Sequence, residues 1–319
     1  MQVFQKEDSI LGGIDEALAI LKTCSGRAEN GEWIPGWDKL VVHALKEGDR
    51  IAPRETVMTI EGDYTLFAHL ETVYLGSMAR RSLIMRNVSE VVEAARGKQI
   101  FYFPARHDHW LVQTGDGWSA HVAGAIGVST DAQASWWGGR GIGTVPHALI
   151  AAYGGNTVTA AVKFAERYHH DMNITVLVDF ENDSVRTALE VAHALGDQLW
   201  GVRLDTSESL VDRSLLDELD PPAGSFTRTG VNPRLVEKVR GGLDGAGFGN
   251  VKIVVSGGFT AARIREFETA DVAVDAYGVG SSLIRGQDDF TADVVLLDGR
   301  PCAKVGRAYA PNPRLERVQ

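Results

Sequence analysis

The sequence predicts an α/β protein in which a parallel barrel follows a smaller unit of mixed helices and strands. From residue 100 onward, short runs of valine, isoleucine and leucine alternate with amphipathic helix patterns, which is typical of a buried parallel sheet. Six or seven such units favour a closed barrel over an open sheet, because no Gly-x-Gly-x-x-Gly motif follows the first strand. Two strand patterns after residue 286 indicate that the tail completes the N-terminal unit.

The N-terminal unit, predicted over residues 1–99, is expected to contain two helices and a strand pair. Residues 13–23 form the first helix, because Ile14, Leu18 and Leu21 recur at helical spacing. Residues 49–64 alternate in polarity and predict the strand pair. The second helix covers residues 65–97, which contain no proline and end at Gly97. Residues 286–319 are expected to add strands around a hairpin turn at Asp298-Gly299.

The barrel is predicted over residues 100–285, and its first strand begins just before, at residue 99. We expect strands over residues 99–106, 173–180, 199–206, 251–258 and 272–282. A turn and helix are expected over residues 141–155, and further helices over residues 183–196, 232–247 and 260–270.

Bulk composition excludes several classes of protein. The 319 residues are 44% hydrophobic and 23% charged, with a net charge of −10 and no long basic run, which argues against nucleic-acid binding. No stretch approaches the roughly 18 apolar residues that a membrane span needs. The cysteines Cys24 and Cys302 lie far apart and have no metal-ligand spacing, so a reduced cytoplasmic setting is expected.

Two glycine-containing loops follow the last two predicted barrel strands. Gly257 and Gly258 come after one strand, and Gly278 and Gly280 come at the end of the next. Glycine lets the backbone approach a ligand closely, and free N–H groups at a helix start bind phosphate. Each pair taken alone is also consistent with a simple turn. The late position of both loops favours one shared phosphate site at the barrel mouth.

Two other predicted strands end in a carboxylate, Asp179 and Asp205. At the barrel mouth these residues can hold Mg²⁺ or face a developing positive charge, or they can cap the next helix. Glu181 is a rival of Asp179 for this role. Arg203 lies two residues before Asp205 and points to the same side of the strand, where it clamps a phosphate or pairs with Asp205.

Two basic residues are expected at the barrel mouth, one at a strand end and one at a helix start. Arg106 ends the first barrel strand and suits a substrate that carries a carboxylate. His147 follows Pro146 at the start of an apolar helix, where the dipole is expected to lower the imidazole pKa. Either His147 is a packed, neutral histidine, or an anion meets it at the helix start.

These motifs together resemble the nicotinate phosphoribosyltransferase family over most of the chain. The segments that carry the resemblance are "FAHLETVYLGSMAR" (67–80), "FPARHDH" (103–109), "GIGTVPHAL" (141–149), "GVRLDTSE" (201–208), "VVSGGFTAARI" (254–264) and "AYGVGSSL" (276–283). The resemblance implies an irregular α/β barrel, similar to a TIM barrel, with an α/β sandwich domain built from the N-terminal and C-terminal segments. It also implies the reaction of nicotinate with 5-phosphoribosyl-1-pyrophosphate to nicotinate mononucleotide and pyrophosphate, coupled to ATP hydrolysis in NAD biosynthesis.

The resemblance assigns roles to individual residues. His147 matches a histidine that ATP phosphorylates transiently, and Arg106 matches the position facing the nicotinate carboxylate. Asp179 and Asp205 match catalytic acidic positions near the ribose and Mg²⁺, and Thr144 and Arg203 are expected to bind substrate, with Thr144 also capping the helix of His147. The residues expected to hold the 5′-phosphate are Ser256, Gly257, Gly258, Gly278, Gly280 and Ser281.

The chain departs from the family pattern in two places. The family has a second arginine after the first, where this chain has His107, which weakens the expected grip on a carboxylate. Family members also carry several dozen residues before the stretch that resembles "MQVFQKEDSILGG", so we expect either a misplaced start or a short protein. The resemblance further implies a homodimer or larger homo-oligomer, with no nucleic-acid or membrane partner.

Two alternatives stay open. Quinolinate phosphoribosyltransferase shares the barrel and the sugar-phosphate site, but it needs more basic residues and no phosphorylated histidine. A non-catalytic, truncated relative is the other alternative, because of the missing N-terminal segment.

Overall fold

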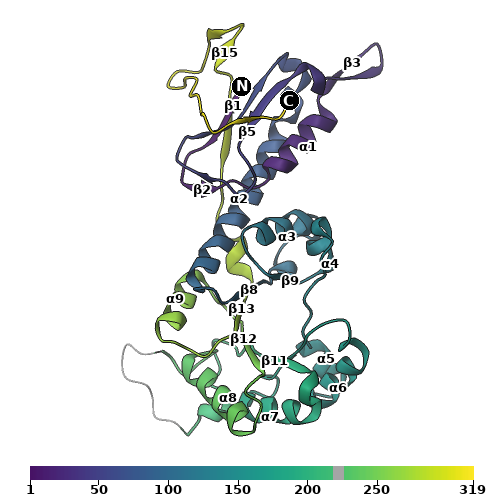
Figure 1. Cartoon of the computed structure of the whole chain (residues 1–319), viewed down its shortest axis with the longest axis vertical. Helices are drawn as coiled ribbons and strands as arrows, with labels where there is room; N and C mark the ends of the chain where they lie inside the picture. The colour runs from purple at the N-terminus through teal and green to yellow at the C-terminus, as the bar shows by residue number, and fades with distance from the viewer. Residues whose placement is uncertain (218–225) are drawn as a thin grey trace. The chain divides into compact units, whose positions relative to one another are not determined.

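The chain divides into two compact units in the computed structural model, which describes residues 1–217 and 226–319 (Figure 1). The first unit comprises residues 1–87, 118–123 and 285–319. The second comprises the described residues of 88–117 and 124–284. None of the described helices combines the length and apolarity needed to cross a membrane.

The first unit is built on a five-stranded antiparallel sheet to which both ends of the chain contribute. Its order is β14-β1-β7-β5-β17, with the bounds β14 (Phe290–Asp293), β1 (Gln2–Gln5), β7 (Thr56–Glu61), β5 (Val41–Ala44) and β17 (Glu316–Arg317). Strand β14 pairs with β1, and β17 pairs with β5, so segments from the C-terminal end form both edges of an N-terminal sheet. This confirms the predicted sandwich domain of two chain segments.

Two helices complete the hydrophobic core of the first unit. Helix α1 (Ile14–Cys24) buries Ile14, Ala17 and Leu21, which lie on one face at helical spacing. Helix α2 (Glu71–Ala94) contributes Tyr74 and Met78 to the same core cluster. Both predicted helices therefore form, and the second begins six residues later than expected, after the short 3₁₀ helices η2 (Tyr64–Leu66) and η3 (Ala68–Leu70).

The small strand pairs of this unit differ in part from the prediction. Strand β6 (Arg50–Ile51) pairs with β2 (Ser9–Ile10) rather than with β7, so residues 49–64 do not pair with themselves. Asp298 and Gly299 form the predicted hairpin turn, at φ 48° and 74°, between β15 (Leu296–Leu297) and β16 (Arg300–Pro301). That hairpin is a separate two-stranded sheet. A further hairpin, β3 (Gly26–Glu29) with β4 (Glu32–Pro35), turns at Asn30-Gly31 and was not predicted.

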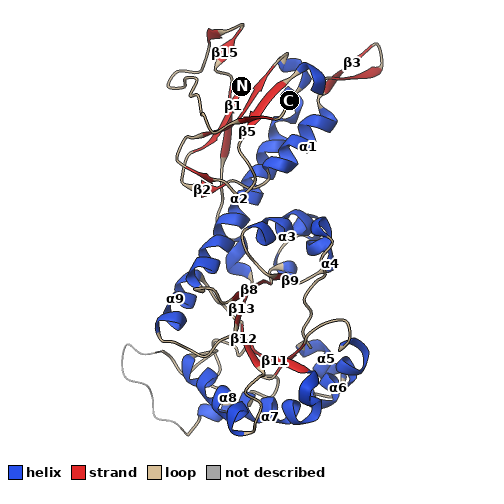
Figure 2. Ribbon diagram, in the orientation of Figure 1, coloured by secondary structure: helices blue, strands red, loops and turns tan. Residues whose placement is uncertain are grey.

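The second unit is a curled parallel sheet with helices around it, as Figure 2 shows. The strand order is β10-β11-β12-β13-β8-β9, and all neighbouring strands are parallel. The bounds are β8 (Gln99–Tyr102), β9 (Gly127–Val128), β10 (Ile174–Leu177), β11 (Leu199–Leu204), β12 (Lys252–Val255) and β13 (Ala276–Val279). Valines and isoleucines fill these strands because both faces of the sheet are covered.

Residues 142–145 connect the two edges of the curled sheet. The N–H of Ile142 donates to the carbonyl of Val128 in β9 at 2.7 Å. Val145 forms a parallel bridge with Val176 in β10, and its N–H donates to the carbonyl of Thr175 at 2.9 Å. The predicted irregular barrel is therefore confirmed, with a single short segment completing it in place of a full strand.

The helices of the second unit follow the strands, as an α/β barrel requires. Their bounds are α3 (Gln113–Val122, partly in the first unit), α4 (Asp131–Ala134), α5 (His147–Ala152), α6 (Thr157–Tyr168), α7 (Ser184–Leu195), α8 (Pro233–Gly245) and α9 (Ala261–Thr269). Helices α3, α4 and α6 were not predicted. Asn156 caps α6 by accepting from the N–H of Thr159 at 2.8 Å, and this capping residue was the available signal.

Candidate functional site

The carboxyl ends of the central strands bring the predicted site residues to one edge of the sheet. Asp179 lies two residues beyond β10, and Asp205, Ser256 and Gly280 each come directly after β11, β12 and β13. These strands run parallel and are neighbours, so their C-terminal loops meet at the same edge. Residues that follow these strands in the sequence therefore lie together at one mouth of the barrel.

His147 is the first residue of α5, and its ring contacts the carboxylate of Asp179. The distance from His147 Nε2 to Asp179 Oδ1 is 3.1 Å, with the histidine side chain 44% exposed and the aspartate 6% exposed. His147 is thus not a packed core histidine. Of the two rival carboxylates, Asp179 faces His147, whereas Glu181 pairs with Arg186.

The expected direction of the His147 pKa shift is wrong. The hydrogen bond to Asp179 raises the pKa of His147 above its ordinary value of 6.5, and this effect exceeds the opposing effect of burial. The negative charge of Asp205 adds to the increase, and Arg203 opposes it. Helix α5 has only six residues, so its dipole is weak beside a buried carboxylate in direct contact.

The Arg203 guanidinium donates hydrogen bonds to three other side chains at the barrel mouth. Its Nε donates to Ser256 Oγ at 2.9 Å, its Nη1 donates to Thr144 Oγ1 at 3.0 Å, and its Nη2 donates to Asp205 Oδ2 at 3.3 Å. Its guanidinium also lies 5.2 Å from the centre of the Phe103 ring. The ion pair with Asp205 therefore forms, and three of the five N–H donors of the guanidinium have protein partners.

Thr144 and Ser256 both hydrogen-bond to the group formed by Arg203 and Asp205, although Thr144 was also expected to cap the helix of His147. Thr144 does not cap the helix of His147, because Pro146 occupies the N-cap position and forms no side-chain cap. The Thr144 hydroxyl instead accepts from Arg203. Ser256 Oγ donates to Asp205 Oδ1 at 2.7 Å, so both carboxylate oxygens of Asp205 are engaged.

The two glycine loops lie against each other. Ser282 Oγ donates to the carbonyl of Phe259 at 2.8 Å, which joins the loop after β13 to the loop after β12. Gly257 and Gly258 have φ values of 87° and 72°, a region that favours glycine. The two loops are therefore adjacent, and their convergence on one anion stays a prediction.

One of the predicted phosphate-binding glycines lies outside these loops. Gly278 is inside β13, where a Cβ would lie 2.7 Å from the Phe103 ring. Its lack of a side chain therefore makes room for Phe103. Gly280 and Ser281 begin the loop proper, and Ser281 starts the short 3₁₀ helix η9 (Ser281–Ile284).

Arg106 lies on the 3₁₀ helix η4 (Ala105–His107) directly beyond β8. Its side chain is exposed and forms no hydrogen bond or ion pair with any residue in the described ranges. Its charge is therefore available to a ligand. The neighbouring His107 places Cε1 3.2 Å from the position that a Cβ of Gly280 would take, so it lies beside the second glycine loop.

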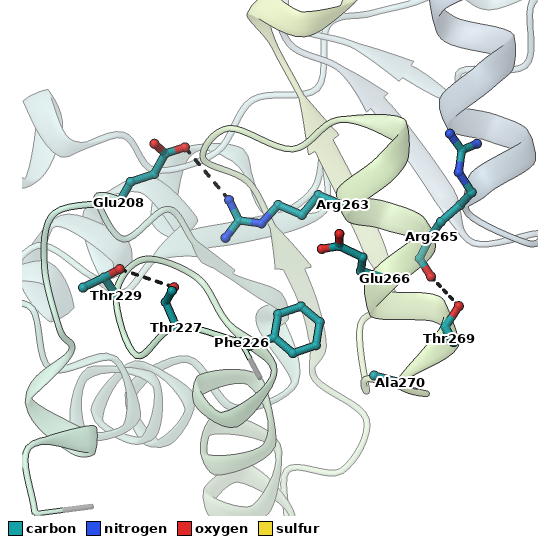
Figure 3. A pocket seen from close by; sticks show the side chains of 9 residues that line it. All are labelled: Glu208, Phe226, Thr227, Thr229, Arg263, Arg265, Glu266, Thr269 and Ala270. Atoms are coloured by element: carbon teal, nitrogen blue, oxygen red, sulfur yellow. Dashed lines mark hydrogen bonds and ion pairs between the residues drawn. The ribbon is translucent and has the colours of Figure 1, made fainter. Parts of the chain in front are cut away.

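Sequence reasoning missed Phe103, Ser282, Glu208 and Arg263 as parts of this region. Figure 3 shows Arg263 of α9 reaching toward Glu208, with a separation of 4.0 Å between Nη1 and Oε1. The signal that could have found Arg263 was its position in the first turn of the helix after Gly257-Gly258. Ser282 likewise lies at the start of a short helix that directly follows Gly280.

Comparisons with known proteins support the fold. The family model described as "Quinolinate phosphoribosyl transferase, N-terminal domain" matches residues 1–82. Nicotinate phosphoribosyltransferase pncB2 of Mycobacterium tuberculosis is 29% identical over 265 residues, covering 81% of this chain and 52% of that protein. The chain thus spans about half the length of the curated relatives that it matches.

Two solved structures are similar over almost the whole chain. The nicotinate-nucleotide pyrophosphorylase from Pyrococcus furiosus is 31% identical with a TM-score of 0.78, covering 99% of this chain and 76% of that one. The human nicotinic acid phosphoribosyltransferase has a TM-score of 0.71 at 15% identity, covering 97% of this chain and 72% of that one. The human structure supports the fold alone.

Proposed function

Because the chain belongs to the nicotinate and quinolinate phosphoribosyltransferase superfamily, we propose that it is a nicotinate phosphoribosyltransferase coupled to ATP. The proposed reaction joins the ring nitrogen of nicotinate to C1 of 5-phosphoribosyl-1-pyrophosphate. The bond from C1 to the pyrophosphate oxygen breaks, and nicotinate mononucleotide and pyrophosphate leave. The curated relatives named for this activity support the proposal at 29% and 23% identity.

The observation that carries the ATP coupling is the contact between His147 and Asp179. Because Nε2 meets the carboxylate, it carries the proton, and Nδ1 is left with a free lone pair in the neutral ring. We assign Nδ1 as the nucleophile that attacks the γ-phosphorus of ATP, with ADP as the leaving group. The ring that results is positively charged, and Asp179 stabilises that charge through the same hydrogen bond.

The remaining mouth residues take the roles that their environments suit. Arg106, exposed and unpaired within the described residues, is assigned to the nicotinate carboxylate. The joined glycine loops are assigned to the 5′-phosphate, together with Ser256 and Ser281. Arg203 has two N–H donors left after its three contacts within residues 1–217 and 226–319, and we assign these donors to substrate phosphate.

Mg²⁺ is proposed as the metal, held by Asp179 and Asp205. No group of three or more potential ligand side chains is present among residues 1–217 and 226–319. Two carboxylates without a complete cage fit Mg²⁺, which takes one or two carboxylates and fills its other positions with water and substrate phosphates. When bound, the ion would neutralise the pyrophosphate charge. Asp179 is the better ligand, because both oxygens of Asp205 already accept hydrogen bonds.

Quinolinate phosphoribosyltransferase is the second candidate. It is favoured by the family model on residues 1–82 and by the 31% identity to a nicotinate-nucleotide pyrophosphorylase. Arg106 and His107 are the basic residues of η4, and a substrate with two carboxylates calls for more positive charge than one arginine provides. We therefore propose nicotinate as the substrate. We also propose that the protein is located in the cytoplasm and forms a homodimer or a larger homo-oligomer.

One assay tests these proposals together. The chain is incubated with 5-phosphoribosyl-1-pyrophosphate and Mg²⁺, with either nicotinate or quinolinate, and with or without ATP. Formation of nicotinate mononucleotide that ATP stimulates is the expected result. Release of carbon dioxide from quinolinate without an ATP effect would support the second candidate. Binding of nicotinate without any product would indicate a non-catalytic relative.

A further inference from the structure

Arg263 extends from the first turn of α9 beside the first glycine loop. Thr260 caps this helix by accepting from the N–H of Arg263 at 3.3 Å. The guanidinium lies 4.8 Å from the centre of the Phe259 ring, and Nη2 donates to the carbonyl of Val231 at 2.6 Å. The side chain is 24% exposed. These contacts fix the position of the guanidinium, and among residues 1–217 and 226–319 the carboxylate nearest to Nη1 is that of Glu208, at 4.0 Å.

Nη1 of Arg263 faces the glycine loop. A Cβ placed on Gly258 would lie 3.8 Å from Nη1 and would collide with Oε1 of Glu208. The Glu208 carboxylate therefore lies over Gly258, 4.0 Å from Nη1, and its side chain is 75% exposed (Figure 3). An exposed carboxylate thus occupies the space directly above a loop whose composition favours an anion.

The charge of Arg263 is only partly balanced. Burial lowers the pKa of Arg263, and the opposing effects of Glu208 and Glu266 do not offset it. A desolvated cation of this kind gains from an anion with better geometry than a single carboxylate oxygen at 4.0 Å. Nη1 lies 3.8 Å from the Cβ position of Gly258, so an anion bound at this loop would lie close to its charge.

We propose that Arg263 is a further phosphate-binding residue of the first glycine loop, and that Glu208 occupies the phosphate position until an anion replaces it. This inference rests on the proposed phosphoribosyl site. The exposed Glu208 side chain swings into solvent when the phosphate arrives, and Nη1 then donates to a phosphate oxygen. Neither contact breaks the anchor of Nη2 on Val231. Glu208 therefore weakens phosphate binding, and Arg263 strengthens it.

Titration of the full chain with inorganic phosphate, followed by calorimetry at low ionic strength, tests the proposal. Glu208→Gln removes the competing charge about 5 Å from the anion, so its phosphate affinity rises about fourfold. Arg263→Met removes a charge-assisted hydrogen bond, and its affinity falls by about tenfold or more. Arg263→Lys keeps a charge but loses the guanidinium fork, so its loss is smaller.

Arg265→Met is the matched control. Arg265 comes from the same helix, is exposed, and points away from Glu208 in Figure 3. Its phosphate affinity is expected to stay within about twofold of the wild type. If Arg263→Met fails to fold, as judged by circular dichroism, Glu208→Gln and Arg263→Lys decide the question. Unchanged affinity in both of those variants, or no phosphate binding by the wild type, overturns the proposal.

The titration contains no pyridine substrate, so it separates this inference from the proposed function. A chain that shows the expected affinity changes but never forms nicotinate mononucleotide refutes the proposed function alone. A chain that forms the product while its phosphate affinity ignores Glu208 and Arg263 refutes this inference alone.

Discussion

Replacement of His147 by alanine tests the proposed mechanism most directly. The substitution removes the ring that contacts Asp179 and leaves the other mouth groups, Arg203, Asp205 and the glycine loops, unchanged. We therefore expect the ATP-dependent increase in nicotinate mononucleotide formation to disappear. A slow transfer that does not depend on ATP should remain, because the groups proposed to bind the sugar phosphate and the metal are still present.

The stability cost of His147→Ala should be small. Within the part of the chain that the structure describes, the His147 ring makes one hydrogen bond, at 3.1 Å, and its side chain is 44% exposed. A hydrogen bond to a charged group contributes about 1.5–3 kcal/mol, and exposure of this size reduces the value to about 1 kcal/mol. Water can enter the space left by the ring and hydrate Asp179. The expected decrease in melting temperature is about 1–2 °C for a chain of 319 residues.

Labelling with γ-³²P ATP provides the assay. The wild type should take up an acid-labile label, and His147→Ala should take up none. Thermal unfolding of both proteins, followed by circular dichroism, serves as the control for folding. A wild type that never takes up label, or a His147→Ala protein that keeps its full response to ATP, would refute the assignment of His147 as phosphate acceptor.

Three further predictions follow from the same geometry. The raised pKa of His147 keeps the ring protonated to a higher pH than usual, and only the neutral ring can attack ATP. The ATP-dependent rate should therefore rise with pH through a pKa above 6.5. Asp179→Asn should move this rising part of the pH–rate profile to lower pH. A profile that does not move would show that another group titrates. Arg106→Ala should raise the KM for nicotinate by about 10- to 150-fold and leave the KM for 5-phosphoribosyl-1-pyrophosphate nearly unchanged in steady-state assays, whereas an equal effect on both would indicate a structural role. Gly257→Ala should lower the free energy of unfolding by about 1–2 kcal/mol because of its φ of 87°. Gly241→Ala, in open space on α8, should raise the free energy of unfolding by about 0.5–1 kcal/mol. Urea denaturation of both variants measures these changes, and a change of the opposite sign in either variant would contradict the prediction.

The same raised pKa affects stability with a definite sign. The folded chain binds the His147 proton more tightly than the unfolded chain does. This contribution is fully present below the unfolded pKa and is lost as the pH rises through the higher folded pKa. Because the ring is nearly half exposed, the contribution should be small, and comparison with His147→Ala across this pH range measures it.

The local sequence pattern was sufficient to predict those strands and helices whose hydrophobic spacing shows within a few residues. Near-continuous apolar runs predicted β10 to β13, since strands buried on both faces need apolar side chains at every position. The strand ends predicted Asp179 and Asp205 at one mouth, because parallel strands share a C-terminal edge. Helix α6 was missed because its β-branched start, Thr157-Val158-Thr159, weakens the helix signal, although its buried alanines lie at helical spacing.

Only the tertiary structure decided which groups meet and with what electrostatic effect. Arg203 finds Thr144 and Ser256 across separations of 59 and 53 residues, and no local pattern encodes such pairings. The sign of the His147 pKa shift depends on the Asp179 carboxylate, 32 residues away. The sequence by itself determined the fold class and the strand-end residues, because short-range periodicity reflects burial. Partner choice and pKa depend on distances of a few ångströms that arise only when the sheet curls.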